Sequence, residues 1–237
     1  MFMGKRKMKQ KMQRKIAAIK RRTIRTKMGK YVFLNLCRTP NPLKGLSNKY
    51  LYKANLYKVL YKGGKFNNVR WNASNITHCS FKNAKCSGVD FFNCNLKNTS
   101  FQNSTLENVV FFNCNLKDVN FKGATFKRVI FISTNIKNAK NLILTDGCII
   151  YKSYPKITID KEISQNIFEL YDFPEFNKYN VLFVSKRKLN LWILKILIDL
   201  YGDDALRALI ALKYRKSKWG FFTVFSFMQH IERYLKV

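Results

Sequence analysis

The chain has 237 residues, of which 45 are Lys or Arg and 13 are Asp or Glu, so its formal net charge is +32 at pH 7. A hydrophobic share of 47% is enough for a folded core, and the length leaves room for one large domain with one or two smaller pieces. No acidic residue precedes Asp90, and residues 1–89 hold 23 of the 45 basic ones. This distribution excludes an acidic surface over the first third of the chain.

Residues 1–30 are predicted to form a cationic helical arm, whose helix over residues 5–28 ends at Gly29. Like charges four residues apart repel, so this helix should become stable when an anionic partner neutralises it. We favour a nucleic-acid partner, because dense Lys and Arg suit the neutralisation of phosphates. An anionic membrane, a mitochondrial targeting peptide and a solvated tail are the alternatives. The basic residues assigned to nucleic-acid binding are Lys5, Arg6, Lys7, Lys9, Lys11, Arg14, Lys15, Lys20, Arg21, Arg22, Arg25 and Lys27.

Residues 31–50 join a short predicted strand, YVFLNLC, to a loop that contains both Pro and Gly. We expect this segment to cap the domain that begins near Leu51. A cap would shield the first edge of that domain from pairing with other chains.

A period of five residues organises residues 51–142, and the seven residues 91–97 recur unchanged as residues 111–117. Short fixed periods are typical of solenoids, and five fits neither an α-helix nor a flat strand. A chain that turns a corner every five residues makes a square coil of twenty, so that residues twenty apart should stack. The sequence sorts such residues into columns of one type: Leu56, Ile76, Leu96, Leu116 and Ile136 are aliphatic, and Tyr61, Phe81, Phe101 and Phe121 are aromatic.

The triplets A-N-L at 54–56, C-N-L at 94–96 and 114–116, and A-T-F at 124–126 resemble the A-(D/N)-L-x-x unit of pentapeptide repeat proteins. The resemblance implies a right-handed quadrilateral β-helix, and hence a mainly β fold. It does not imply one function, because members of the family do different things. Some members protect DNA gyrase by imitating DNA with a negative surface, and this chain departs from them in its sign of charge.

The residue after the large inward one forms two columns rich in Lys. One face has Lys97, Lys117 and Lys137 below Thr77, and the next has Lys62, Lys82 and Lys122 together with Gln102. Strands stack about 4.8 Å apart, so these ammonium groups repel one another. The columns are either a solubilising surface or a cationic face that complements an anionic partner. We assign all six lysines to nucleic-acid binding.

Large apolar residues also occupy outward positions on the later coils, and these are Phe92, Val110, Phe112, Ile130 and Ile132. An apolar patch of this kind should not remain exposed to water. We expect the C-terminal segment to fold back onto it. The alternative is a homodimer or partner surface, which would make the five residues an interaction site.

Residues 143–237 lose the period of five and are predicted to form a mainly helical module. Helices are expected over residues 160–171, 190–201, 203–216 and 221–235, with a short strand at 181–184. The apolar run LNLWILKILIDLY is too short to cross a bilayer, which needs about 20 residues. Trp192 and Trp219 are expected in the core of this module.

The six cysteines do not suggest a metal site or a disulfide framework. Cys79, Cys94 and Cys114 occupy small inward positions of the repeat and Cys86 a large one, so we interpret them as reduced core thiols. Reduced thiols indicate a reducing compartment, here taken as the cytoplasm.

No phosphate-binding glycine loop, H-E-x-x-H motif, nucleophile elbow or kinase signature is present in the sequence. The candidates for acid–base chemistry are Asp203 with Asp204 and His230 with Glu232, and helix capping and surface pairing explain both pairs more simply. We therefore predict that the chain is not an enzyme and has no cofactor, metal or small-molecule substrate.

These features predict a non-catalytic binding or scaffold protein that engages an anionic macromolecule, namely RNA, DNA or a nucleoprotein particle, through the arm and the lysine columns. Recognition should be largely independent of nucleotide sequence, because phosphate contacts carry no base information. A protein–protein interaction module, for example a topoisomerase regulator that is not an acidic DNA mimic, is the first alternative. Peripheral binding to anionic membranes is the second.

Overall fold

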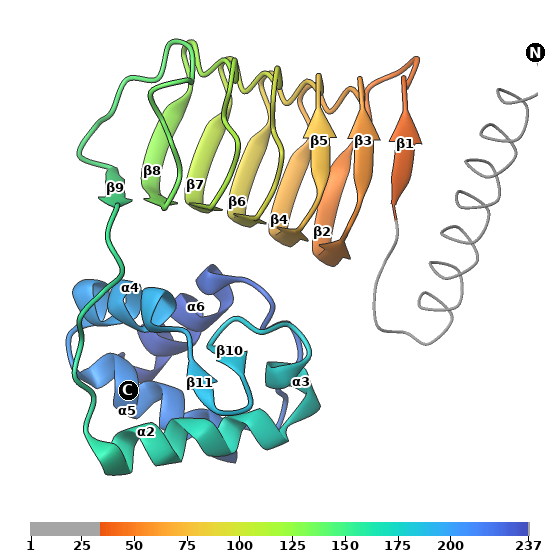
Figure 1. The fold of residues 1–237 in the computed structure, drawn as a ribbon. Helices are drawn as coiled ribbons and strands as arrows, with labels where there is room; N and C mark the ends of the chain where they lie inside the picture. Colours follow the sequence, from red (N-terminus) through yellow and green to blue (C-terminus); the bar gives the residue numbers. More distant parts are fainter. Residues whose placement is uncertain (1–33, 237) are drawn as a thin grey trace, which may run out of the picture.

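The computed structural model describes residues 34–236. The predicted basic arm over residues 1–30, with all of the basic residues assigned to it, lies outside the described residues. Figure 1 shows a stack of parallel strands with a helical module packed against one side of it. Within residues 34–236, no helix is long and apolar enough to cross a membrane.

The stack consists of two parallel sheets. The larger has the order β2 (Gly45–Tyr52), β4 (Lys65–Asn72), β6 (Lys85–Phe92), β7 (Thr105–Phe112), β8 (Thr125–Ile132) and β9 (Cys148–Tyr151). The smaller contains β1 (Asn35–Cys37), β3 (Asn55–Tyr57) and β5 (Asn75–Thr77), and isolated bridges such as that from Asn95 to Asn115 continue it into later coils.

The register of both sheets is the predicted twenty residues. Leu56 lies opposite Ile76 in the smaller sheet, and Leu51, Trp71 and Phe91 lie opposite one another in the larger. The prediction of a quadrilateral β-helix is therefore confirmed. Parallel pairing already includes β1 and β2, so the coils begin before Leu51. At the other end Val129 lies opposite Cys148, which shortens the last coil by one residue.

The corners explain why the period is five. Every fifth residue from Asn48 to Ser133 has a positive φ, between 45° and 69°. This left-handed region is disfavoured for most residues, while Gly adopts it freely and Asn tolerates it. Asn fills many of these corners and Gly63, Gly88 and Gly123 fill three more. Each eight-residue strand, such as β6 with its corner at Gly88, therefore covers two faces of the square coil.

Stacked aromatic rings fill the interior of the coils. Phe101 packs face to face between Phe81 and Phe121, with centroids 5.0 and 5.4 Å away. All three are at most 1% exposed, and full burial of a large apolar side chain contributes roughly 1.5 to 3 kcal/mol. An inward hydroxyl can also bond to the coil before it, as when the Thr99 hydroxyl donates to the Ile76 carbonyl at 2.7 Å. Neighbouring coils thus stabilise one another, as in other solenoids.

The C-terminal module has a second hydrophobic core. Its elements are α2 (Lys161–Phe168), the 3₁₀-helix η1 (Glu169–Asp172), α3 (Pro174–Asn177), the antiparallel pair β10 (Phe183–Ser185) and β11 (Lys188–Leu189), α4 (Leu191–Tyr201), α5 (Asp204–Ala211), η2 (Leu212–Tyr214) and α6 (Val224–Tyr234). A mainly helical region after the solenoid was predicted, and the structure confirms it.

Several details of the module differ from the prediction. The last helix begins at Val224, because the Thr223 hydroxyl accepts from the Ser226 N–H and caps it there. The helix predicted over residues 203–216 is α5, and it continues into the 3₁₀-helix η2, which ends at Tyr214. Trp192 is 8% exposed and lies in the core as expected, whereas Trp219 is 67% exposed, so its assignment to the core was wrong. Trp219 lies in the segment between η2 and α6, outside either hydrophobic cluster.

Candidate functional site: the faces of the solenoid

The outward side chains of the coils define faces with different surroundings. We call the face formed by residues 69–72, 89–92, 109–112 and 129–132 the module face, because the helical module packs on it. We call the two faces that carry the predicted lysine columns the lysine faces. Lys62, Lys82, Lys117, Lys122 and Lys137 are exposed there, and Lys97 is half-buried.

A ladder of asparagine amides runs along the first lysine face. Each Nδ2 donates to the Oδ1 of the asparagine one coil earlier, at 2.9 to 3.1 Å, from Asn115 through Asn95, Asn75 and Asn55 to Asn35. The ladder ties successive coils together at their surface. It holds the neighbouring lysine column, Lys97 to Lys137, on a rigid frame.

A carboxylate interrupts the positive charge of the lysine faces. Asp118 lies at the corner between them and pairs with Lys140 at 2.8 Å. The hydrogen bond from Lys140, together with the charges of Lys140, Lys117 and Lys97, lowers the pKa of Asp118, so it carries its negative charge at neutral pH. The lysine faces are therefore cationic surfaces with a fixed acidic point within them.

The module face holds all five apolar residues that the sequence singled out. Phe92, Val110, Ile130 and Ile132 are at most 5% exposed, and Phe112 is partly buried against the same cluster. They pack against the module of the same chain, which is the expected folding back of the C-terminal segment. The alternative, a homodimer or partner surface made of these five residues, does not fit the structure, because the module already covers them.

A buried ion pair anchors the module, and we did not predict it. Arg70 and Asp90 are 2% and 0% exposed, with 3.3 Å between Nη1 and Oδ2. Asp90 Oδ2 also accepts from the backbone N–H of Val224, the first residue of α6, at 2.9 Å. A carboxylate at a helix N-terminus is favourable. Burial raises the pKa of Asp90 to about 6, although the neighbouring Arg70 charge acts to lower it.

The sequence did contain a signal for this pair. Arg70, Asp90, Val110 and Ile130 form one outward column at spacing twenty, and the predicted apolar patch contained only the last two. Two opposite charges in a column that is otherwise apolar indicate a buried pair.

A partly buried cluster forms a second anchor near the end of α6. Arg128 donates to Glu232 at 2.9 Å, and the Tyr201 hydroxyl donates to the same Glu232 Oε1 at 2.7 Å. Burial acts to raise the pKa of Glu232, but these two hydrogen bonds outweigh it and lower the pKa. Glu232 is therefore engaged in docking and does not face His230, whose Nε2 lies 2.7 Å from the carbonyl oxygen of Ala208.

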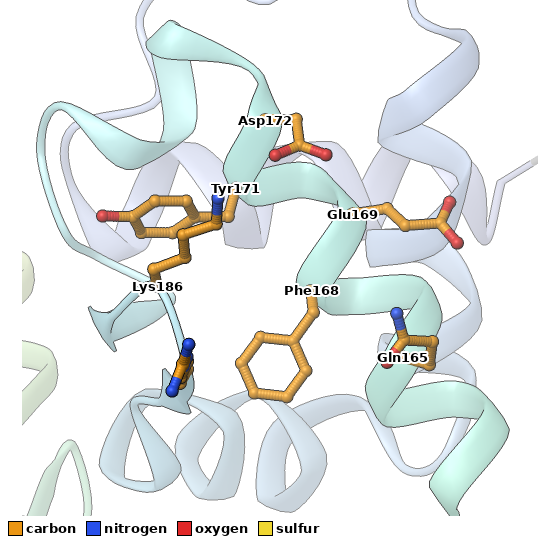
Figure 2. Close-up of a pocket in the computed structure, with 7 residues that line it drawn as sticks. Gln165, Phe168, Glu169, Tyr171, Asp172 and Lys186 are labelled. Carbon is orange, nitrogen blue, oxygen red and sulfur yellow. The ribbon is translucent and has the colours of Figure 1, made fainter.

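The module also carries a surface hollow of about 350 Å³, shown in Figure 2. Lys186 lies beside Tyr171 there, while Glu169 points away and pairs with Lys213 at 2.6 Å. Opposite charges line this hollow, and it holds no nucleophile with an adjacent base. Within residues 34–236, no group of three His, Cys, Asp or Glu side chains could hold a metal ion.

The family model "Pentapeptide repeats (8 copies)" matches residues 72–108 and 106–140. The solenoid is built of pentapeptide repeats. No curated protein sequence matches the chain. The matched residues lie within the coils that the strand register and the isolated bridges define.

Solved pentapeptide repeat structures resemble the chain only in part. The chain is 16% identical to trypsin-treated QnrB1, a plasmid-mediated fluoroquinolone resistance protein; the match covers 46% of this chain and 55% of that one, with a TM-score of 0.41. It is 19% identical to the pentapeptide repeat protein Rfr23 of the cyanobacterium Cyanothece 51142, over 52% of this chain and 98% of that one, with a TM-score of 0.23. At these values the likenesses carry no argument about function.

Proposed function

We propose that the chain is a non-catalytic scaffold that binds an acidic protein surface through the lysine faces of its pentapeptide-repeat solenoid. The observation that carries the proposal is the division of the solenoid surface: the module covers one face, and the exposed lysine columns lie on others. Lysines at the same position of successive coils form a regular cationic array at about the 4.8 Å strand spacing. Such an array complements an acidic surface and favours fast, specific encounter.

Asp118 is the reason for preferring a protein to a nucleic acid as the partner. It is a charged carboxylate among Lys97, Lys117 and Lys140, where a phosphate backbone following the lysines would pass. Phosphate binding gains from an unbroken run of cations, since each contact releases counterions. A surface of lysines, asparagine amides and one carboxylate instead resembles the polar rim and mixed charge of protein interfaces. The predicted nucleic-acid binding gains no support from these faces.

We further propose that the scaffold works in the cytoplasm. All six cysteines are free thiols, and four of them are buried. Free thiols are kept in reducing compartments.

Affinity capture of the tagged full-length chain from nuclease-treated lysate tests the proposal. We expect a defined protein partner to remain bound after nuclease treatment. A variant with Glu in place of Lys97, Lys117 and Lys137 should lose most of that partner, because three attractive charges become repulsive.

The matched control carries the same charge change on exposed lysines of the C-terminal segment, at Lys152, Lys156 and Lys161. It should retain the partner. Loss of all bound material on nuclease treatment would contradict the proposal and favour a nucleic-acid partner. Equal loss in both variants would show that net charge, and not the lysine faces, governs binding.

A further inference from the structure

A cavity of about 390 Å³ lies between the module face and the C-terminal module. The solenoid contributes Arg70, Phe92 and Asn93 to its wall, and the module contributes Lys188 and Trp192. Sites for small ligands have volumes of roughly 300 to 1,000 Å³ and occur where two packed units meet. This cavity is at the small end of that range and suits a ligand of one or two rings.

Aromatic side chains from both units form a continuous part of the cavity wall. The rings of Phe92 and Phe112 stack with centroids 4.7 Å apart, and Trp192 meets Phe112 edge-on at 6.2 Å. Tyr154 meets Trp192 edge-on at 5.6 Å and is still 50% exposed although it lines the cavity. A planar ring placed against such a wall gains stacked or edge-to-face contacts.

The charged groups that line the cavity are both cationic donors. Arg70 and Lys188 line it, and among the described residues no Asp or Glu does. Lys188 has no ion-pair partner within residues 34–236. Arg70 is held through Nη1 by Asp90, and its buried Nε has no hydrogen-bond partner in the described chain.

Asn93 adds a further donor because an amide ladder ends there. Its Oδ1 accepts from Asn113 Nδ2 at 2.7 Å. One coil earlier the corresponding residue is Ala73, whose side chain has no acceptor, so the side-chain ladder stops at Asn93 and its Nδ2 makes no rung there. Donors without acceptors beside an unpaired ammonium group favour an anionic ligand.

We propose that this cavity binds a small aromatic anion, with its ring against the aromatic wall and its anionic group beside Lys188 and Asn93. A carboxylate on a benzene-sized ring is the simplest ligand of this class. The site is separate from the lysine faces, so the proposal goes beyond the scaffold function and does not depend on it.

Fluorine NMR on the full-length protein tests the proposal with two probes of the same ring and opposite charge, para-fluorobenzoate and para-fluorobenzylamine. We expect saturable line broadening of the benzoate at millimolar concentrations and none of the amine. Lys188→Glu should weaken benzoate binding at least about tenfold, a factor equivalent to about 1.4 kcal/mol. Lys186→Glu is the matched control, because Lys186 lies in the same hairpin, two residues before Lys188, but lines the other hollow (Figure 2).

Absence of benzoate broadening, or equal broadening of the amine, would overturn the proposal. Equal weakening by Lys186→Glu and Lys188→Glu would also overturn it, since net charge alone would then explain binding. Tyr154→Ala provides a second variant at a half-exposed position and should weaken benzoate binding without unfolding the chain. Unchanged affinity in both Tyr154→Ala and Lys188→Glu would place the probe elsewhere.

Discussion

Replacement of Asp90 by Ala is the sharpest test of how the module is attached. The substitution removes the carboxylate that accepts from both Arg70 and the first N–H of α6. It leaves the Arg70 guanidinium, which is 2% exposed and stacked 3.8 Å from the Phe92 ring centroid, without a counter-charge. The module and the solenoid would then meet around an uncompensated buried cation.

The expected loss of stability follows from that burial. Removing one partner of a buried ion pair costs about 3 to 5 kcal/mol, and an unpaired buried N–H contributes to the loss. We therefore expect Asp90→Ala to lower the free energy of unfolding by about 4 kcal/mol. The double variant Arg70→Met with Asp90→Leu removes both charges, so its stability should lie within about 2 kcal/mol of the wild type.

Urea denaturation followed by tryptophan fluorescence measures both values. Trp71 is buried in the solenoid and Trp192 in the module, so each unit has its own probe. The emission of Trp192 should change at lower urea in Asp90→Ala, and the double variant should restore its midpoint. A loss below about 1 kcal/mol in Asp90→Ala, or a double variant less stable than the single one, would refute a docking role for the pair.

Three further predictions concern the corners, the core and the second anchor. Gly88→Ala should lower the free energy of unfolding by about 2 kcal/mol or more, because its φ is +64° and the new Cβ would lie 2.2 Å from Phe225. Gly63→Ala, with φ +69° and no atom within 4 Å of the new Cβ, should lower it by only about 1 kcal/mol through backbone strain. Thermal melts of the two variants measure this difference. Phe101→Ala should lower the free energy of unfolding by about 3 to 5 kcal/mol, because it leaves a cavity in a stacked aromatic column. Urea titrations measure this loss, and a value below about 1 kcal/mol would mean that the coils do not depend on the Phe101 ring. Because the pKa of Glu232 is lowered, its contribution to stability is present above its unfolded pKa of about 4.5 and is lost as pH falls through the folded value. Glu232→Gln should therefore make the free energy of unfolding fall less steeply as pH is lowered through this range. An unchanged acid slope would exclude this role.

The repeat was predictable because side chains twenty residues apart occupy equivalent places. The column from Leu56 to Ile136 and the aromatic column at Phe101 both follow from sorting the sequence in twenties, and the register of β2 to β8 agrees. The burial of Ile130 and Ile132 by the module also followed from the sequence, since exposed apolar faces are unfavourable.

The docking geometry and the cavity could not be predicted in the same way. No local period relates Val224 of α6 to Asp90, which lie 134 positions apart and meet only when the module is docked. The cavity collects Phe92 and Asn93 from a coil, Lys188 from a hairpin and Trp192 from a helix, so no motif in the chain contains it. Trp219 was placed in the core on composition alone, although its side chain belongs to neither hydrophobic cluster and is 67% exposed.

The most direct test of the scaffold account is an amine-labelling footprint of the lysine faces in nuclease-treated lysate. Mass spectrometry would compare the labelling of Lys97, Lys117 and Lys137 in lysate with that in the purified chain. The account predicts protection of these three lysines in lysate, while Lys152 and Lys156 stay equally labelled in both samples. Equal labelling of all five lysines in the two samples, or protection that disappears with nuclease, would contradict binding of a protein partner at the lysine faces.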